Sequence, residues 1–412
     1  MRIFDRELSA PKGFWDGTHR TRSPAQTLAA YGPRMGELGV TRLADVSGLD
    51  HLGVPVFTAM RPNSRSRAVF EGKGMDRDAA RASALMEAIE GWHAERVELP
   101  LRHESLAALR RAGEPVLDIR RLALYPGAVL REEAPLLWVQ GHELMSGAPC
   151  WVPFECVTTN CVRSPQLPPT FGVTTNGLAS GNHLLEAIVH ALCELIERDA
   201  CALWQLAGGA QRKDLQLELA SVRDPAARGL IERLHDAGLE VAVWEATSDI
   251  AVPAFECQLF ERPETMPVAP KGLHSGQGCH LDPAVALMRA LTEAVQSRAG
   301  ASAGGRDDVF DYEPAVDLDE LRVLQRALAD PPPTRPFPHD ARVTDSFEGD
   351  VAVIVEALAC AGIEQAAVVD LTRPDVGVPV AKVVVPGLER ARDPGDNALG
   401  ARGRAAAAHV VG

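Results

Sequence analysis

The sequence predicts an α+β protein with mixed sheets. This prediction rests on long segments with apolar residues at helical spacing, short runs rich in β-branched residues, and an irregular alternation of the two. Helices are expected over residues 77–98, 183–206, 225–237 and 283–298. Strands are expected over residues 136–140, 240–245, 351–356, 365–370 and 380–385. No strict βαβαβ order repeats, so a single parallel sheet is not expected.

Three segments are expected to lie outside these elements. Residues 330–338 are rich in proline and predict a stiff linker or surface loop. Residues 301–306 are small and glycine-rich and predict a mobile loop. Residues 390–412 are rich in Gly, Ala and Arg with a weak pattern, so they are expected either to be partly disordered or to order against another element.

The composition excludes several classes of protein. The 412 residues are 46% hydrophobic and carry a formal net charge of −14, and such a field repels phosphates, so we expect no nucleic-acid or anionic-membrane partner. No segment approaches the roughly 18 consecutive apolar residues that span a bilayer. Residues 1–14 lack the apolar core of a secretory signal, so a cytoplasmic location is predicted. The eight cysteines form no CxxC pair, so free buried thiols are expected rather than structural zinc.

Two of the predicted helices carry oxygen-bearing side chains on one face. Glu87 and Glu90 are three positions apart on the first helix, with Ser83 one turn earlier. Glu293 and Gln296 repeat this spacing on the last helix. For either helix alone, a solvated or salt-bridged surface face would explain the pattern as well.

A solvent-exposed face is a weaker explanation for the polar residues of the helix over residues 183–206. Glu186, His190, Glu194 and Glu197 fall in one stripe, because eleven residues make about three turns. The remaining positions are strongly apolar, so the stripe lies on an otherwise buried helix. Buried carboxylates in a row need cations or protons to be tolerated.

Together, the three helices offer the hard oxygen ligands that Mg²⁺ prefers. Other site types fail on spacing. Glu186 and His190 are four apart, whereas a di-iron helix needs ExxH, and no HExxH for zinc occurs. Gly72-Lys73-Gly74 lacks the other residues of a P-loop, so a nucleotide would bind through metals and scattered cations.

Several segments, in order, resemble the YcaO superfamily. They are Arg61-Pro-Asn with Gly72-Lys73-Gly74, Ser83 to Glu90, Asn176 to Asn182 leading into Glu194 to Asp199, Arg289 to Arg298, Asp370 to Gly377, and Val383 to Glu389. The resemblance implies a YcaO-type fold with three carboxylate-bearing helices around a nucleotide site. It divides the chain into an N-terminal segment over residues 1–60, a catalytic core over 61–389 and a tail over 390–412.

The resemblance also implies cofactors and site residues. In that family, carboxylates hold Mg²⁺ ions that bridge the phosphates of ATP. The implied metal ligands are Glu87, Glu90, Glu194, Glu197 and Glu293. The implied cofactor-binding residues are Arg20, Thr27, Lys73, Ser83, Asn182, Glu186, Arg198, Gln296 and Arg298. An ordinary loop arginine is an equal explanation for Arg20. His190 is a candidate base, although a packed or ligand-orienting histidine is the favoured interpretation.

The sequence departs from many family members in two places. Gly91 stands where an arginine is common, and the chain ends in Ala-His-Val-Val-Gly without a proline-rich tail or a fused peptide-docking domain. This pattern is similar to members that work with a separate TfuA-like partner, several of which install thioamides. We therefore expect ATP-dependent thioamide formation in a peptide or protein, by a homodimer. Alternatives are an azoline-forming cyclodehydratase, a non-catalytic ATP-binding accessory protein and an unrelated Mg²⁺ phosphohydrolase.

Overall fold

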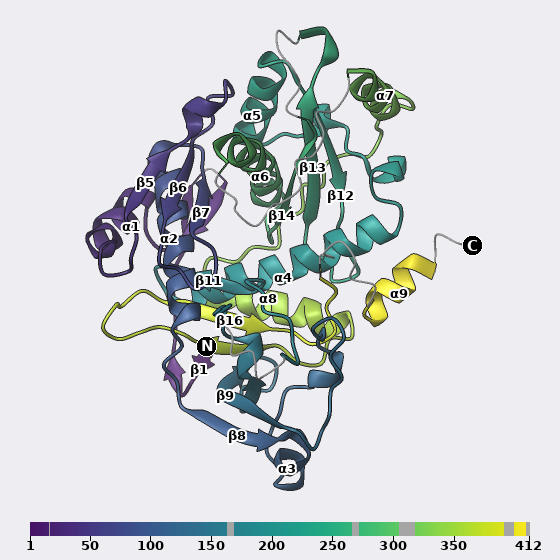
Figure 1. Cartoon of the computed structure of the whole chain (residues 1–412). Coiled ribbons are helices and arrows are strands. Elements are labelled where there is room, and N and C mark those ends of the chain that lie inside the picture. Colours follow the sequence, from purple (N-terminus) through teal and green to yellow (C-terminus); the bar gives the residue numbers. More distant parts are fainter. Residues whose placement is uncertain (16, 163–168, 266–271, 305–317, 391–398, 409–412) are drawn as a thin grey trace.

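A computed structural model describes residues 1–15, 17–162, 169–265, 272–304, 318–390 and 399–408. Helices and antiparallel sheets are mixed along the chain, so the predicted α+β class is confirmed (Figure 1). Two three-stranded sheets, each with its own helices, lie beside a larger central sheet (Figure 1).

The first unit is a helix, a three-stranded antiparallel meander and a second helix. Its elements are α1 (Pro24–Tyr31), β5 (Arg42–Asp45), β6 (Val56–Met60), β7 (Val69–Lys73) and α2 (Arg77–Glu95). The predicted boundary after residue 60 passes through this sheet, between β6 and β7, and the division into segments stays a prediction.

The second unit has the same order of elements. They are α5 (Pro225–Asp236), β12 (Leu239–Glu245), β13 (Ala254–Glu261), β14 (His274–Cys279) and α6 (Pro283–Ala303). In both units the helix that follows the meander packs on its last strand. Gly72 of β7 lies against Ala80 and Ala84 of α2, and Gly278 of β14 lies against Ala286 and Ala290 of α6.

The central sheet has the strand order β10-β9-β15-β16-β11, with β8 also paired to β9. Its strands are β8 (Leu101–Ser105), β9 (Pro135–Glu143), β10 (Pro149–Pro153), β11 (Leu178–Ser180), β15 (Ala367–Asp370) and β16 (Val380–Val384). Val368 packs with α4 (Leu184–Leu206) and α8 (Phe347–Cys360), whereas its neighbour Val369 packs in the core that contains α2. Helices therefore cover both faces of the sheet.

Helix α4 crosses between the second unit and the central sheet (Figure 1). Its apolar residues share one core with β16 and α8, and also with β13 and β14 of the second unit. The smaller elements are β1 (Arg2–Ile3), β2 (Arg6–Glu7), β3 (Gly13–Trp15), β4 (Thr18–Arg20), α3 (Leu106–Arg111), α7 (Leu318–Ala329) and α9 (Ala401–Ala408).

Most predicted elements are present, but one strand prediction is wrong. Residues 351–356 lie inside helix α8, where Ser346 caps the first turn and Val351, Ile354 and Leu358 are buried at helical spacing. The β-branched residues of this segment favour a strand, but its buried residues are spaced three and four positions apart, which is the spacing of a helix.

One of the segments expected outside regular elements differs from prediction, and the tail follows one of its two expected alternatives. Residues 301–303 form the last turn of α6, which ends at Gly304 with a φ of 60°, and residues 305–306 lie outside the described residues. In the tail, α9 orders against α4. Arg402 of α9 donates two hydrogen bonds of 2.8 Å to Asp199 of α4, which is fully buried, and also pairs with Asp249. Residues 391–398 and 409–412 of the tail lie outside the described residues.

All eight cysteines are free, and five of them are buried as expected, whereas Cys161 and Cys360 are exposed. Among the residues that the structure describes, no helix is both long and apolar enough to cross a membrane.

The glycines under α2 and α6 give a test of this packing. A Cβ atom at position 278 would stand 2.0 Å from the Ala286 carbonyl oxygen, so Gly278→Ala must push α6 away from β14. We expect Gly278→Ala to lower the free energy of unfolding by about 1–3 kcal/mol in urea denaturation. Gly229→Ala, in α5, is the control, because nothing lies within 4 Å of its added methyl group. Equal midpoints for the two variants would contradict the described packing.

Candidate active site

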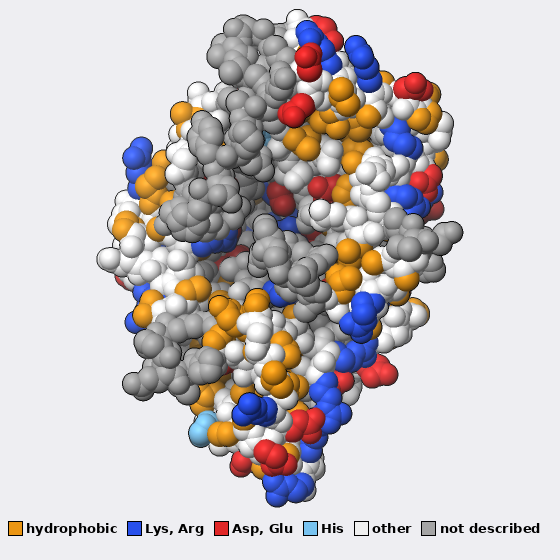
Figure 2. Space-filling model, turned by 45° about the vertical axis from the view of Figure 1, so that its right-hand side comes forward, with side chains coloured by type: hydrophobic (Ala, Val, Ile, Leu, Met, Phe, Trp, Pro, Cys, Tyr) orange, Lys and Arg blue, Asp and Glu red, His pale blue; other side chains and the backbone are white. Residues whose placement is uncertain are grey.

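A cavity of about 300 Å³ lies between the first unit, α4 and α6. Side chains from β4, α1, β7, α2, β11, α4 and α6 line it. The predicted residues that line the cavity are Arg20, Thr27, Lys73, Ser83, Glu87, Glu90, Asn182, Glu186, His190, Glu194, Glu197, Arg198, Glu293 and Gln296. Acidic and basic side chains gather in a hollow on the face drawn in Figure 2.

Helix α2 brings Glu87 and Glu90 to the cavity. Glu87 accepts hydrogen bonds of 3.1 Å from the Arg67 guanidinium and from the backbone N–H of Glu71. Glu90 accepts two bonds of 2.8 Å from the backbone N–H and the hydroxyl of Ser180. These contacts tie α2 to β7 and to β11.

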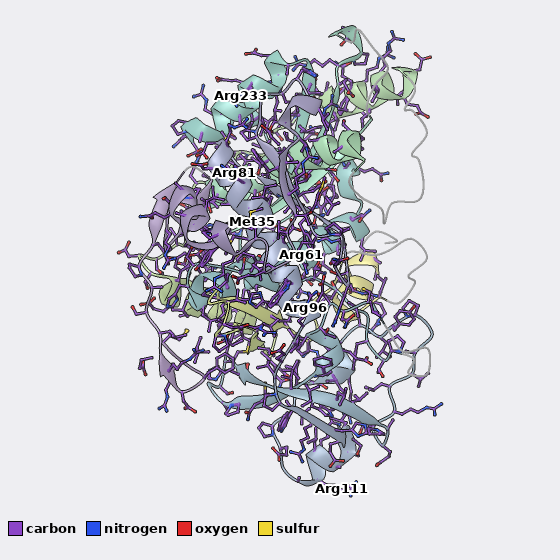
Figure 3. The ribbon with its side chains drawn as sticks, turned by 60° about the vertical axis from the view of Figure 1, so that its left-hand side comes forward. Met35, Arg61, Arg81, Arg96, Arg111 and Arg233 are labelled. Atoms are coloured by element: carbon purple, nitrogen blue, oxygen red, sulfur yellow. The ribbon has the colours of Figure 1, made fainter. Side chains whose placement is uncertain are left out.

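The end of α2 is fixed by a buried ion pair. Glu95, 2% exposed, accepts a 2.8 Å bond from Arg61 and a 2.6 Å bond from the Ser66 hydroxyl. Arg96 also bonds to Glu95, and Figure 3 shows Arg61 and Arg96 near one another. The orientation of α2, and hence of its two cavity carboxylates, depends on this pairing.

Helix α4 supplies the longest acidic stripe. Glu186 accepts bonds of 2.9 and 2.8 Å from the N–H and hydroxyl of Thr21. Glu194 accepts a 3.0 Å bond from the backbone N–H of Gly177. Glu197 is 1% exposed, and its Oε2 has no hydrogen-bond partner among the described residues. One oxygen of this buried carboxylate therefore lacks a hydrogen-bond donor among the described residues.

Helix α6 completes the cluster with Glu293. Lys73 of β7 donates a 2.5 Å hydrogen bond to Glu293, and Arg198 of α4 lies 3.9 Å from its other oxygen. Arg289, one turn earlier, places its guanidinium 3.0 Å from Nδ1 of His190. Elements far apart in the sequence thus meet through ion pairs that cross the cavity.

Burial and mutual repulsion shift the protonation of these acids. Burial, then the neighbouring Glu87, raises the pKa of Glu90 to about 8. Burial also raises the pKa of Glu87, Glu194 and Glu197. Burial opposes ionisation of Glu293 as well, but Lys73 and Arg198 outweigh it and lower its pKa. With Glu71 and Glu186 included, the cavity is lined by seven carboxylates and five lysine or arginine side chains, so the acids are in surplus.

His190 is neutral in this setting. Burial, followed by repulsion from Arg289 and Arg20, lowers the pKa of His190 well below its usual value. Its Nδ1 faces a guanidinium that can only donate, so this nitrogen is the acceptor of the neutral ring. A role for His190 as a base stays a prediction.

Arg298 is the one predicted site residue that the structure places away from the cavity. Its side chain is 1% exposed and bonds to Asp50 at 2.7 Å and to Glu261 at 2.5 Å. Five residues beyond Glu293 turn a helix by about 140° past one full turn, so Arg298 points to the other side of α6. The predicted nucleotide contact does not fit this position.

Four residues that the sequence analysis did not assign also shape the site. Glu71, Arg22 and Arg289 line the cavity. Lys382 lies behind it, where its ammonium donates bonds of 2.7 and 2.8 Å to the carbonyls of Thr174 and Asn176. Burial lowers the pKa of Lys382 to about 8, against the attraction of Glu194. Two of these residues could be seen in the sequence: Glu71 alternates with Lys73 along one strand, and Arg289 lies one helical turn before Glu293.

The described residues hold no group of three His, Cys, Asp or Glu side chains already arranged to bind a metal ion. Each of four cavity carboxylates instead accepts hydrogen bonds from its own lysine, arginine, serine or backbone N–H donors: Glu87, Glu90, Glu194 and Glu293. Their chemistry nevertheless fits Mg²⁺, because they are hard oxygen donors in surplus and Glu197 Oε2 has no partner among the described residues.

A family model described as "YcaO cyclodehydratase, ATP- and Mg²⁺-binding" matches residues 71–389. The chain belongs to the YcaO family. The resemblance stated from the sequence is thus confirmed, together with the YcaO-type fold and with ATP and Mg²⁺ as the cofactors of this YcaO protein.

Proteins of similar sequence occur in bacteria and archaea. This YcaO protein is 35% identical over 384 residues to an uncharacterized protein in the tfuA 3′ region of Rhizobium leguminosarum, covering 92% of the chain and 90% of the relative. It is 37% identical over 377 residues to an uncharacterized protein of Methanothermobacter thermautotrophicus, covering 89% and 94%.

Two solved structures share the fold. YcaO from Methanopyrus kandleri, bound with AMPPCP and Mg²⁺, is 24% identical with a TM-score of 0.71, covering 92% of this chain and 95% of that one. A heterocyclase in complex with substrate and cofactor is also 24% identical, with a TM-score of 0.75, covering 93% and 54%.

The raised pKa of Glu90 predicts a pH-dependent gain in stability for Glu90→Gln. The unfolded carboxyl ionises near its ordinary pKa of 4.5 and the folded one only near 8, so ionisation costs stability increasingly as the pH rises between these values. In EDTA, we expect the variant to melt about 2–4 °C above the wild type at pH 8. The gain should vanish at pH 4.5, and an equal gain at both pH values in thermal scans would contradict the assignment.

Proposed function

We propose that this YcaO protein uses ATP and Mg²⁺ to phosphorylate the oxygen of a peptide backbone amide, leading to a thioamide in a ribosomally made peptide or protein. The observation that carries the proposal is the convergence of Glu87, Glu194 and Glu293, from three helices, on one cavity. The location of the Rhizobium relative in a tfuA 3′ region supports a TfuA-like partner protein.

The reaction must make a poor leaving group depart. Attack of sulfide on the amide carbon gives a tetrahedral oxyanion. This oxygen takes the γ-phosphoryl group of ATP, with release of ADP. The carbon–oxygen bond then breaks, inorganic phosphate leaves, and loss of the S–H proton forms the carbon–sulfur double bond. Bound Mg²⁺ supplies neutralisation of charge on the phosphoryl group.

The acidic and the basic residues of the cavity would have different roles in this reaction. The carboxylates of Glu87, Glu90, Glu194, Glu197 and Glu293 would hold the metal ions. The cations of Lys73, Arg198, Arg289 and Arg20 face the same space and would contact phosphate oxygens. Lys73 bonds to Glu293, so it would become available to a phosphate oxygen if Glu293 held a metal ion instead. The protein contributes positioning and electrostatics rather than a covalent nucleophile.

Azoline formation is the second candidate, because the matching family model names cyclodehydratases. There a Cys, Ser or Thr side chain of the substrate attacks the preceding amide, and the same phosphorylation follows. A non-catalytic ATP-binding accessory protein stays the third possibility. The predicted homodimer is part of this proposal and is tested by light scattering after gel filtration.

Mass spectrometry separates these functions. The purified chain is incubated with a TfuA-like protein, a precursor peptide, ATP, Mg²⁺ and sulfide. Thioamide formation adds about 16 mass units to the peptide, whereas azoline formation removes about 18, and phosphoryl activation is common to both. An unchanged peptide mass with no ADP released would favour the accessory protein and contradict the proposal.

Removing one carboxylate of α4 tests the cofactor site itself. Glu194→Gln keeps the acceptor for the Gly177 N–H but loses the charge, so we expect calorimetry to show Mg²⁺·AMPPCP binding weakened about 10–100-fold. Glu37→Gln is the control, because the Glu37 side chain is 69% exposed and lies in an ion pair with Arg34. Unchanged affinity in Glu194→Gln would speak against the carboxylate site.

A further inference from the structure

The two units of the fold repeat individual contacts as well as the order of their elements. Asp76 caps the N-terminus of α2, and Asp282 caps that of α6. Gly72 and Gly278 lie under alanines at matching positions of the two helices. These pairs share a single spacing along the sequence, so the units can be superposed residue by residue without a gap from β7 into α2 and from β14 into α6.

The same spacing relates the cavity carboxylates. Glu87 accepts the backbone N–H of Glu71 at 3.1 Å, and Glu293 accepts the backbone N–H of Gln277 at 3.5 Å. Glu87 and Glu293 are therefore equivalent residues, each bound to the strand in front of its helix. Glu90 corresponds to Gln296 in the same register.

The two units differ in charge at these equivalent positions. The first unit has carboxylates at positions 71, 87 and 90, whereas the second unit has amides at two of the three equivalents, Gln277 and Gln296. An amide keeps the shape of the side chain but lacks the charge that favours Mg²⁺. Gln277 instead accepts a 2.5 Å bond from Arg198. The two units thus differ in charge at two of the three equivalent positions.

The carboxylate of Glu71 occupies a space beside helix α6 that a glycine leaves open. Gly300 lies inside α6, where a Cβ atom would stand 2.4 Å from Glu71 Oε1 and 2.9 Å from Oε2. Glycine inside a helix is less stable than alanine, so its presence here needs a local reason. The reason is that the carboxylate of Glu71 fills the space of the missing side chain.

A second observation indicates that this cluster is built for a ligand. Glu197 lines the cavity with a side chain that is 1% exposed, and its Oε2 has no hydrogen-bond partner among the described residues. A buried carboxylate oxygen without a partner is costly unless a cation or donor reaches it from the cavity.

We propose that Glu71 is a further carboxylate of the metal–nucleotide site and that Glu71, Glu87 and Glu90 make the first unit its cation-binding wall. The inference rests on the proposed function, because it extends the same site. The second unit presents Arg289 and Gln296 to this cavity and has Glu293 as its one carboxylate there, so it is the less acidic wall. Gly300 positions the Glu71 carboxylate and does not itself touch the metal.

Mn²⁺ binding in the presence of AMPPCP, followed by electron paramagnetic resonance on the full chain, tests this assignment. We expect Glu71→Gln to weaken Mn²⁺ binding about tenfold, because one charged ligand is lost. We expect Gly300→Ala to weaken it as well, because the new methyl group displaces the carboxylate. Gly229→Ala is the matched control, since its helix position is open and Mn²⁺ affinity should not change.

The outcomes separate this inference from the function on which it rests. Wild-type affinity in Glu71→Gln would overturn the role of Glu71, while Mn²⁺ and AMPPCP binding by the wild type would still uphold the cofactor site. No binding by the wild type would overturn both. Should Gly300→Ala fail to fold in thermal scans, Glu71→Gln decides alone, because neutralising a carboxylate beside Glu87 relieves repulsion.

Discussion

Repulsion between carboxylates that share one cavity is the constraint on which this structure depends. Glu87, Glu90, Glu194, Glu197 and Glu293 come from three helices and lose much of their hydration where they meet. Glu87, Glu90, Glu194 and Glu293 each accept a hydrogen bond from a cation or an N–H donor, whereas Glu197 keeps one oxygen without a partner in the described part of the chain. The fold therefore accepts a local loss of stability at the point where the family binds ATP and Mg²⁺.

The rest of the molecule supports that arrangement. Apart from Asp199, helix α4 is largely apolar away from its acidic stripe, so packing against α8, β16 and the second unit leaves that stripe and Arg198 facing the cavity. The two units each bring a helix, α2 and α6, to line the same cavity. Lys382 holds the chain segment before Gly177, whose N–H binds Glu194, and so links the central sheet to the acidic stripe.

Sequence periodicity predicted much of this site, and three-dimensional packing decided the rest. Glutamates three and four positions apart had to share helix faces, so the stripe on α4 could be identified from residue spacing alone. Arg298 lay near such a face in sequence, but helical geometry turns it toward Asp50. Lys382 could not be predicted, because a lysine inside an apolar strand acquires its partners only through pairing of β16 with β11.

Helix α9 adds an energetic link between the end of the chain and the cavity. Asp199 is fully buried and follows Glu197 by two residues on α4, and Arg402 is its charged partner. Detaching α9 would leave the buried carboxylate of Asp199 without its arginine, at a cost in stability typical of a broken buried salt bridge. Without that partner the carboxyl group would take up a proton or regain water, and either change would act on the helix that carries the acidic stripe. Docking of the terminal helix therefore helps to hold α4, and with it the acidic stripe, in its place beside the cavity.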